Sequence, residues 1–176
     1  MSDKRAVVFC SASNDIDPIY NQAAREIVRA ACLSGYDIVS GGTIKGTMKV
    51  VCDEASACGV EVIGAIPRFM KGLEHPQLSR CIWTDKMSER KDAMREGTCL
   101  AIALPGGIGT LDELSETYCL AKMGIYKGRV VAFNMDGFYE PYRRQLDLFV
   151  EKGMLDKASR KLISFPETVE QLKSLL

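Results

Sequence analysis

Short apolar runs rich in valine and isoleucine alternate with longer amphipathic segments along this chain. The apolar runs predict strands at residues 6–10, 36–40, 60–66, 81–84, 99–104 and 129–134, with a weak strand at 162–164. Helical periodicity predicts helices at residues 16–33, 45–58, 87–96, 110–123, 141–152 and 167–175. Residues 67–80, which hold two prolines and a glycine, form the one long irregular connection.

Strands that alternate with helices are typical of a parallel sheet covered on both faces. We therefore expect an α/β fold, a Rossmann-like, doubly wound and mostly parallel sheet. A length of 176 residues fits a single domain over residues 1–176. Ligands of such folds bind beyond the carboxyl ends of the strands, where the strand order switches. Two predicted strands end in glycine clusters, Gly41-Gly42 and the run from Gly106 to Gly109, and these mark the expected binding edge.

Composition excludes several classes of function. Lysine plus arginine and aspartate plus glutamate number 23 each, so the net charge is zero and a basic surface for nucleic acid or for anionic membrane is not expected. The longest apolar run, residues 99–104, is far shorter than the roughly 20 residues of a membrane helix. A single histidine, His75, excludes a His-rich zinc site and leaves little scope for imidazole catalysis.

The seven cysteines are odd in number and form no C-x-x-C pair. We interpret them as small buried apolar side chains in a reducing compartment, which predicts a cytoplasmic protein. Metal or disulfide roles are the alternative. The short apolar run near the N-terminus, residues 6–10, is too short for a signal-peptide core.

The sequence Pro-Gly-Gly-Ile-Gly-Thr at residues 105–110 lies between a predicted strand and a predicted helix. Glycines let backbone amides approach an anion, and the helix N-terminus adds a positive dipole end, so the segment predicts a phosphate site. A P-loop is excluded because the chain has no Gly-Lys-Ser/Thr, and Asp112 stands where a dinucleotide fingerprint needs a small residue. The alternative is a plain tight turn.

Glu113 follows Thr110 by three residues, and this spacing has two interpretations. Thr-x-x-Glu is a capping box, in which the glutamate bonds back to the helix N-terminus. Alternatively, an apolar stripe through Leu111, Leu114 and Tyr118 places Glu113 off the buried face, near the mouth of the ligand crevice. That second position suits a catalytic carboxylate, and the spacing leaves both interpretations open.

Arg90 and Lys91 share one side of their predicted helix with Met87 and Met94. Burial of a cation beside methionines is costly unless the cation is paired. One interpretation is that the apolar stems pack while both charges stay in water. The other is an arginine directed at a carboxylate or a phosphate, which the planar guanidinium suits better than an ammonium group.

Residues 87–94 (MSERKDAM) and 105–113 (PGGIGTLDE) together resemble the LOG (LONELY GUY) family, often labelled lysine decarboxylases. Residues 8–10, 41–42, 62–67 and 136–139 extend the resemblance over most of the chain. The family consists of cytokinin-activating phosphoribohydrolases. The resemblance implies a Rossmann-like homodimer that hydrolyses the N-glycosidic bond of a nucleoside 5′-monophosphate such as AMP or an N6-substituted AMP. The expected products are free base and ribose 5-phosphate, and neither metal nor organic cofactor is expected.

The resemblance also assigns roles by position. It implies that Arg90 and Glu113 are the catalytic pair. It further implies that nucleotide binding involves Ser13, Gly42, Glu74, Lys91, Gly106, Gly107, Ile108, Gly109 and Thr110, of which residues 106–110 hold the phosphate. His75 lies beside Glu74 and is expected to border the site without acting in it.

Several positions depart from the family's pattern. The family's Cys-Gly-Ser-Ser reads Cys-Ser-Ala-Ser at residues 10–13, so Ser11 replaces a glycine, and its third glycine and the following serine are Thr43 and Ile44. The histidine before Glu-Arg-Lys is Ser88. The family's Thr-Trp-x-Gln-Leu-Gly reads Cys-Leu-Ala-Lys-Met-Gly at residues 119–124, which changes positions 119, 120 and 122 to Cys119, Leu120 and Lys122. The catalytic and phosphate positions match, whereas the preferred base stays open. A non-catalytic nucleotide sensor or carrier on the same fold is the alternative function.

Overall fold

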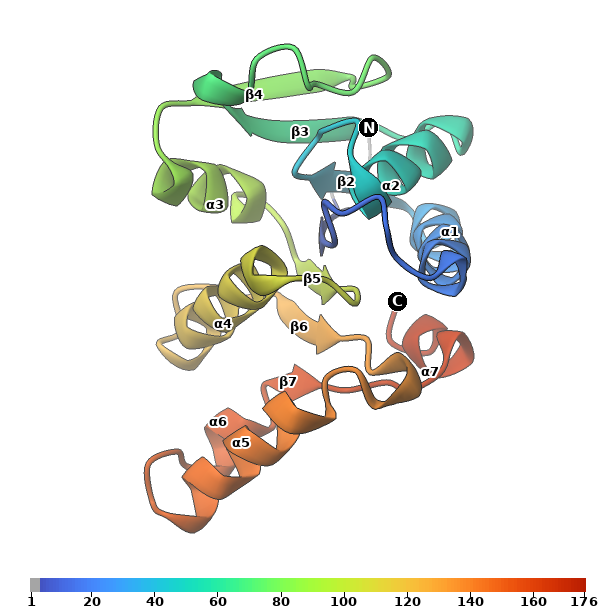
Figure 1. Cartoon of the computed structure of the whole chain (residues 1–176). Coiled ribbons are helices and arrows are strands. Elements are labelled where there is room, and N and C mark those ends of the chain that lie inside the picture. Colours follow the sequence, from blue (N-terminus) through green and yellow to red (C-terminus); the bar gives the residue numbers. More distant parts are fainter. Residues whose placement is uncertain (1–3) are drawn as a thin grey trace.

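Within residues 4–176, the part of the chain that the computed structural model describes, seven strands form one sheet (Figure 1). All neighbouring strands are parallel, in the order β4-β3-β2-β1-β5-β6-β7. The strands are β1 (Lys4–Phe9), β2 (Tyr36–Ser40), β3 (Val62–Pro67), β4 (Arg80–Thr84), β5 (Leu100–Ala103), β6 (Arg129–Ala132) and β7 (Ile163–Ser164). The prediction of a doubly wound, Rossmann-like α/β fold is confirmed.

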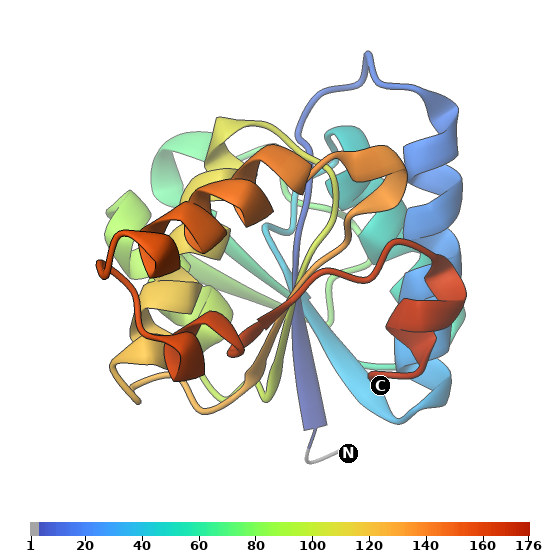
Figure 2. The same ribbon diagram turned by 90° about the horizontal axis from the view of Figure 1, so that it is seen from below.

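Helices cover both faces of the sheet, as Figure 2 shows with the sheet seen edge-on. One face carries α1 (Pro18–Leu33), α2 (Gly46–Ala57) and α7 (Val169–Lys173). The other face carries α3 (Met87–Arg95), α4 (Ile108–Lys122), α5 (Glu140–Glu151) and α6 (Lys157–Arg160). Two short 3₁₀ turns, Arg68–Met70 and Met135–Gly137, lie in connections.

Strand periodicity explains the two cores. In β1, Ala6 and Val8 point into the core under α1 and α2, whereas Val7 and Phe9 point into the core under α3 and α4. All four side chains are buried, because helices cover both faces of the parallel sheet and leave no face of this strand in solvent. This is why the central strands read as continuous apolar runs in the sequence.

The observed elements differ from the predicted ones at the start of α4 and at α6. Helix α4 begins at Ile108, two residues before the predicted start, with Gly107 as its N-cap. Helix α6 was not predicted; it has four residues and begins where the Asp156 carboxylate accepts a hydrogen bond from the Ser159 amide at 2.8 Å. The connection at 67–80 holds a 3₁₀ turn and a single bridge between Thr43 and Glu74.

The strand order switches at β1, which pairs with β2 on one side and β5 on the other. The chain runs outward through β2, β3 and β4 and then returns to add β5, β6 and β7 on the opposite side of β1. The loops that leave β1 and β5 therefore diverge at their carboxyl ends. In open parallel sheets, such a divergence is where ligands bind.

Candidate active site

A cavity of about 370 Å³ opens at the carboxyl ends of β1 and β5, at the switch in strand order. It lies at the edge of the sheet where the sequence predicted a binding site. The lining comes from the turn after β1, the end of β2, the 3₁₀ turn after β3, and helices α2, α3 and α4. The lining residues are Val8, Cys10, Ser11, Ala12, Ser13, Gly41, Met48, Met70, Met87, Arg90, Met94, Gly107, Ile108, Gly109, Thr110 and Glu113.

Arg90 of α3 and Glu113 of α4 form an ion pair in this cavity. The Arg90 Nη1 atom donates to Glu113 Oε1 at 2.8 Å, and Arg90 Nε donates to the Ala65 carbonyl at 3.0 Å. Arg90 is 7% exposed and Glu113 is 8% exposed. The guanidinium therefore lies among protein groups rather than in water, which excludes the interpretation in which its stem packs and its charge remains solvated. A charge-assisted pair of this kind holds both side chains in one orientation.

Two local features place the Arg90 side chain. Glu89 Oε2 accepts hydrogen bonds from the Asp85 and Lys86 amides, at 3.0 and 3.2 Å, and so fixes the start of α3. Gly41, at the end of β2, has no side chain, and a Cβ there would lie 2.3 Å from Arg90 Nη2. The guanidinium therefore fits only because residue 41 is glycine.

Burial and charge act in opposite directions on Glu113. Desolvation raises the pKa of Glu113 above its ordinary value, whereas Arg90 opposes that rise, through its charge and its hydrogen bond. Burial also raises the pKa of the neighbouring Cys10 thiol well above its ordinary value, with a further contribution from Glu113. The pair thus offers a carboxylate with a fixed cationic partner in a site shielded from water.

The glycine loop lies across the cavity from Arg90. Gly107, Ile108, Gly109 and Thr110 line the cavity at the first turn of α4, and no side chain caps this helix. A Cβ on Gly107 or Gly109 would meet no other atom within 4 Å, so space is open around both. Free backbone amides at a helix N-terminus attract an anion, and this geometry favours phosphate over a plain turn.

The capping-box interpretation of Thr110 and Glu113 is wrong. Thr110 is the third residue inside α4 because the helix starts earlier than predicted, and Gly107 is the N-cap. The Glu113 carboxylate bonds to Arg90 rather than to the helix N-terminus. The expectation that Glu113 lies off the buried face is also corrected, because the face that it shares with α3 is itself buried.

The turn after β1 forms the wall beside the glycine loop. The Ser13 amide donates to Ser11 Oγ at 3.0 Å, and the Gly46 amide donates to Asn14 Oδ1 at 2.9 Å. Gly46 has a φ of 52°, and a Cβ there would lie 2.5 Å from the Ser13 carbonyl oxygen. The start of α2 therefore packs directly on this turn, which places exposed Ser13 at the cavity.

Four of the residues expected to bind the nucleotide do not line the cavity. Lys91 Nζ contacts Asp112 Oδ2 at 3.0 Å and Glu116 Oε2 at 3.2 Å, between α3 and α4. Glu74 accepts from the Gly72 amide at 2.6 Å. Gly42 has a φ of 68° and packs on Gly64, because a Cβ on Gly42 would lie 2.6 Å from the Gly64 Cα. Gly106 packs against Thr110 and Ser11. The structure thus brings Arg90, Glu113, Ser13 and residues 107–110 together.

Sequence reasoning missed the sulfur atoms of the site. Cys10, Met48, Met70, Met87 and Met94 all line the cavity. Helical periodicity did place Met87 and Met94 beside Arg90, but nothing in the sequence linked them to residues 10, 48 and 70. These residues come from separate elements, and only the tertiary fold brings them together.

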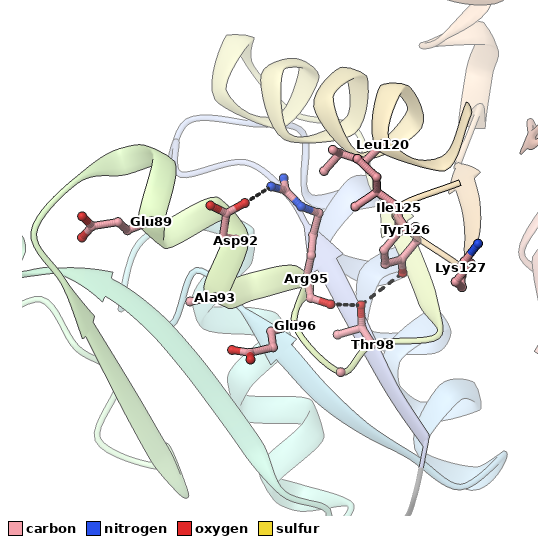
Figure 3. A pocket seen from close by; sticks show the side chains of 11 residues that line it. Glu89, Asp92, Ala93, Arg95, Glu96, Thr98, Leu120, Ile125, Tyr126 and Lys127 are labelled. Atoms are coloured by element: carbon pink, nitrogen blue, oxygen red, sulfur yellow. Dashed lines mark hydrogen bonds and ion pairs between the residues drawn. The ribbon is translucent and has the colours of Figure 1, made fainter. Parts of the chain in front are cut away.

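A larger, open groove of about 700 Å³ lies between the C-terminal half of α3 and the end of α4 (Figure 3). In Figure 3 the Arg95 side chain points to Asp92, with an Nη2–Oδ1 distance of 2.6 Å, and Tyr126 contacts Thr98. Arg95 Nη1 also donates to Glu116 at 2.6 Å. Arg95 and Asp92 of this groove are thus paired, and the groove lies at the amino ends of the strands, away from Glu113.

His75 does not line the cavity. Its ring is buried, Nε2 lies 3.0 Å from Asp53 Oδ1, and Nδ1 accepts from the Gln77 amide at 3.3 Å. Its own amide donates to the Gly42 carbonyl at 2.8 Å, so His75 ties the 67–80 connection to α2 and β2.

Across residues 4–176, no three His, Cys, Asp or Glu side chains lie together as a metal site. No helix in that same range is long and apolar enough to cross a membrane.

Comparison with solved structures shows the same fold. The molybdenum cofactor carrier protein MCP of Chlamydomonas reinhardtii superposes with a TM-score of 0.73 at 19% identity, over 98% of this chain and 95% of that one. A molybdenum cofactor binding protein of Rippkaea orientalis gives a TM-score of 0.73 at 20% identity, over 98% and 94% of the two chains. At these identities the likeness concerns the fold alone.

Sequence comparison identifies closer relatives. A family model described as "Possible lysine decarboxylase" matches residues 48–176. The cytokinin riboside 5′-monophosphate phosphoribohydrolase LOG of Oryza sativa subsp. japonica is 33% identical over 171 residues, 96% of this chain and 71% of that protein. The corresponding enzyme LOG4 of Arabidopsis thaliana is 33% identical over 174 residues, 97% and 81% of the two chains. With the glycine loop and the Arg90–Glu113 pair in place, these matches show that the chain belongs to the LOG family.

Proposed function

We propose that the protein hydrolyses the N-glycosidic bond of a nucleoside 5′-monophosphate, AMP or an N6-substituted AMP, to free base and ribose 5-phosphate. The observation that carries the proposal is the buried Arg90–Glu113 pair, which faces an uncapped helix N-terminus across a single cavity. Relatives named as cytokinin riboside 5′-monophosphate phosphoribohydrolases support it.

The geometry suggests how each part would act. The phosphate would bind the amides at the start of α4, which anchors the ribose toward Glu113. Cleavage of the bond between C1′ and the base nitrogen develops positive charge on the sugar, as in glycoside hydrolysis. A carboxylate beside that charge stabilises it and orients or deprotonates the attacking water. Burial raises the pKa of Glu113, and Arg90 opposes that rise by favouring the ionised carboxylate. Water is the only co-reactant, so we propose no cofactor.

A decarboxylase that uses pyridoxal phosphate would need a lysine for its Schiff base. Within the described chain, the lining of this cavity includes no lysine. The lysine next to the catalytic pair in sequence, Lys91, is held by Asp112 and Glu116 instead. The description of the family model therefore does not set the proposed reaction.

Incubation with AMP and with an N6-substituted AMP, followed by chromatography of free base and ribose 5-phosphate, tests the proposal. We expect both products in equal amounts. Glu113→Gln should lower turnover by about 100- to 10,000-fold while AMP still binds in a calorimetric titration, because the phosphate anchor remains. Glu151→Gln, at the exposed end of α5 and outside the cavity lining, is the control and should stay within a few-fold of wild type.

Saturable AMP binding without either product would instead support the alternative function, a nucleotide sensor or carrier. The departures from the family's pattern at Ser11 and Thr43 lie close to this cavity and are the reason to keep both substrates in the assay. Failure of both binding and turnover would contradict the proposal altogether.

We also propose that the protein is a cytoplasmic homodimer.

A further inference from the structure

Half of the chain's methionines gather at one cavity. The sequence has eight methionines, and four of them line the cavity of the Arg90–Glu113 pair: Met48, Met70, Met87 and Met94. They come from α2, the 3₁₀ turn after β3, and α3. Among the remaining described methionines, Met123 and Met154 are exposed at other places on the surface.

The four thioethers differ in their access to solvent. Met94 and Met48 are buried, with 1% and 8% of their surface exposed. Met87 is 47% exposed at the first residue of α3, and Met70 is half-buried. Small oxidants reach accessible thioethers first. Within the cavity, Met70 and Met87 are therefore the reactive positions. Met87 lies one helical turn before Arg90 on α3.

We propose that Met70 and Met87 form an oxidation site that controls nucleotide binding in this cavity; the inference rests on the proposed function. A hydroperoxide such as hydrogen peroxide transfers one oxygen atom to Sδ. An S–O bond forms, the O–O bond breaks, the sulfur loses two electrons, and the peroxide is reduced to water. Methionine sulfoxide reductases reverse the step with electrons from thiols.

Oxidation changes the chemistry of the cavity wall. The cavity that Met70 and Met87 line is largely apolar, and its lining includes Ile108 and the two buried methionines. A sulfoxide replaces a soft, apolar sulfur with a polar oxygen that has to be hydrogen-bonded or solvated. A nucleotide base that packs against this wall would leave the oxygen unsatisfied, so we expect binding about five- to tenfold weaker.

Cys10 is the competing oxidation target in the same cavity. It is 7% exposed, and burial raises the pKa of its thiol well above the ordinary value, so that little thiolate is present. Because peroxides react with the thiolate, Cys10 is expected to react slowly. The methionine sulfurs carry no such dependence on ionisation.

The experiment treats the full chain with graded hydrogen peroxide, with and without saturating AMP, and quantifies sulfoxide at each methionine by peptide mass spectrometry. AMP should protect Met70 and Met87 but leave exposed Met123 and Met154 unprotected. AMP affinity, measured by calorimetry, should fall in step with oxidation of Met70 and Met87. Methionine sulfoxide reductases A and B with dithiothreitol should restore it, whereas dithiothreitol alone should not.

Variants identify the responsible residues. Each variant is compared with its own untreated affinity. Met70→Leu/Met87→Leu should keep that affinity at peroxide doses that impair wild type, and Met123→Leu/Met154→Leu should lose affinity as wild type does. Equal peroxide sensitivity in the first double variant, or recovery with dithiothreitol alone, would overturn the inference.

The readouts separate this inference from the proposed function. Sulfoxide formation and AMP affinity are measured without turnover, so absence of hydrolysis would contradict the enzyme while leaving the oxidation result intact. An unchanged AMP affinity after oxidation of Met70 and Met87 would contradict the oxidation site alone. If untreated protein fails to bind AMP, both fall together.

Discussion

The position of the Arg90 guanidinium depends on the absence of a side chain at Gly41. Gly41 directly follows β2, and a Cβ there would lie 2.3 Å from Arg90 Nη2 and 2.4 Å from Met48 Sδ. Neither contact leaves room for a methyl group. The guanidinium is also fixed by the Ala65 carbonyl and by Glu113, so it has little freedom to move aside.

Gly41→Ala should therefore impair the site more than the fold. The added methyl forces Arg90 away from Glu113, and overpacking of this kind costs about 1–3 kcal/mol of stability. We expect kcat to fall by about tenfold or more, because the carboxylate loses its partner. Steady-state kinetics and urea unfolding measure the two effects. Gly59→Ala, at a φ of 75° but with open space around it, is the control. It should lower stability alone, and an equal kinetic loss there would contradict the explanation.

The pH dependence of the reaction should report Glu113. Because burial raises its pKa, the ionised form that the reaction needs is lost on acidification at a pH above the ordinary glutamate value of about 4.5. The negative charge of Asp112 raises the pKa of Glu113 further, and the positive charge of Lys91 lowers it. Asp112→Asn should therefore move the acid limb of kcat/KM to lower pH, and Lys91→Met should move it to higher pH.

Opposite shifts from two neighbouring residues are hard to produce by a general structural change. The pH profile of kcat/KM for each variant, fitted for its acid limb, gives the measurement. Glu170→Gln on α7, which lies on the other face of the sheet, should leave the limb in place. Shifts in the same direction for both variants would assign the limb to another group.

At the level of single residues, the sequence predicted the site only in part. Arg90 could be found because helical periodicity placed a cation among methionines, where it needs a partner. Only the family resemblance paired it with Glu113, because Glu113 lies 23 residues further along and its local spacing also fits a capping box. Gly41 is essential to the packing for a reason that appears only once α3 lies above β2.

At the level of elements, ionic contacts join α3 to the first half of α4. Arg90 bonds to Glu113, Lys91 to Asp112 and Glu116, and Arg95 to Glu116. On each helix, neighbouring members of this set lie about one turn apart or closer, so the contacts hold the two helices in register. The Arg90–Glu113 pair is thus one member of a series of ionic contacts between α3 and α4.

Arg95→Met should reveal this role. The Arg95 side chain is 6% exposed, and its loss leaves half-buried Glu116 with Lys91 alone, so we expect about 2–3 kcal/mol of lost stability. Arg144→Met is the matched control. Arg144 is 78% exposed in its pair with Glu140, and the change should cost about 0.5 kcal/mol or less. Urea unfolding measures both free energies, and similar small losses would show that the α3–α4 contacts contribute little.

The elements themselves were largely predictable from the sequence. Short continuous apolar runs and stripes of period 3.6 identified every strand and all α-helices except α6, because a parallel sheet covered on both faces imposes these patterns directly. The start of α4 was misplaced because Gly107 gives no side-chain cap to recognise. Helix α6 was missed because four residues are too few for any periodicity.

At the scale of the whole molecule, α4 presents a second stripe on its outer side. Ile108, Leu111, Ser115 and Cys119 follow one another at spacings of three and four residues, which places them on one face. Ile108 is 83% exposed, Cys119 is exposed, and the other two are half-buried, whereas Leu114 and Tyr118 pack into the core against the sheet and are buried. Ile108 also belongs to the cavity lining, so this stripe is continuous with the candidate active site.

The proposed homodimer would place this stripe against its own copy. Two α4 helices that cross antiparallel at Ser115 would bring Ile108 beside Lys122 of the partner subunit, at the mouth of the cavity. Small side chains at positions 115 and 119 permit the close approach of two helices. We therefore predict that Ser115 lies at a two-fold axis, where residue 115 of each copy meets its counterpart.

A cysteine on a two-fold axis can form a disulfide with its own copy, which makes the prediction direct to test. In a Cys99→Ser/Cys119→Ser background, which removes the two exposed native thiols, Ser115→Cys should give a covalent dimer on mild oxidation. Ser174→Cys, exposed after α7 on the other face of the sheet, is the control and should stay uncrosslinked. Light scattering should give twice the chain mass for wild type, and Ser115→Arg should lower it toward the monomer. A monomeric wild type would refute the homodimer, whereas a dimer that forms without the Ser115→Cys cross-link would place its interface on another face of the molecule.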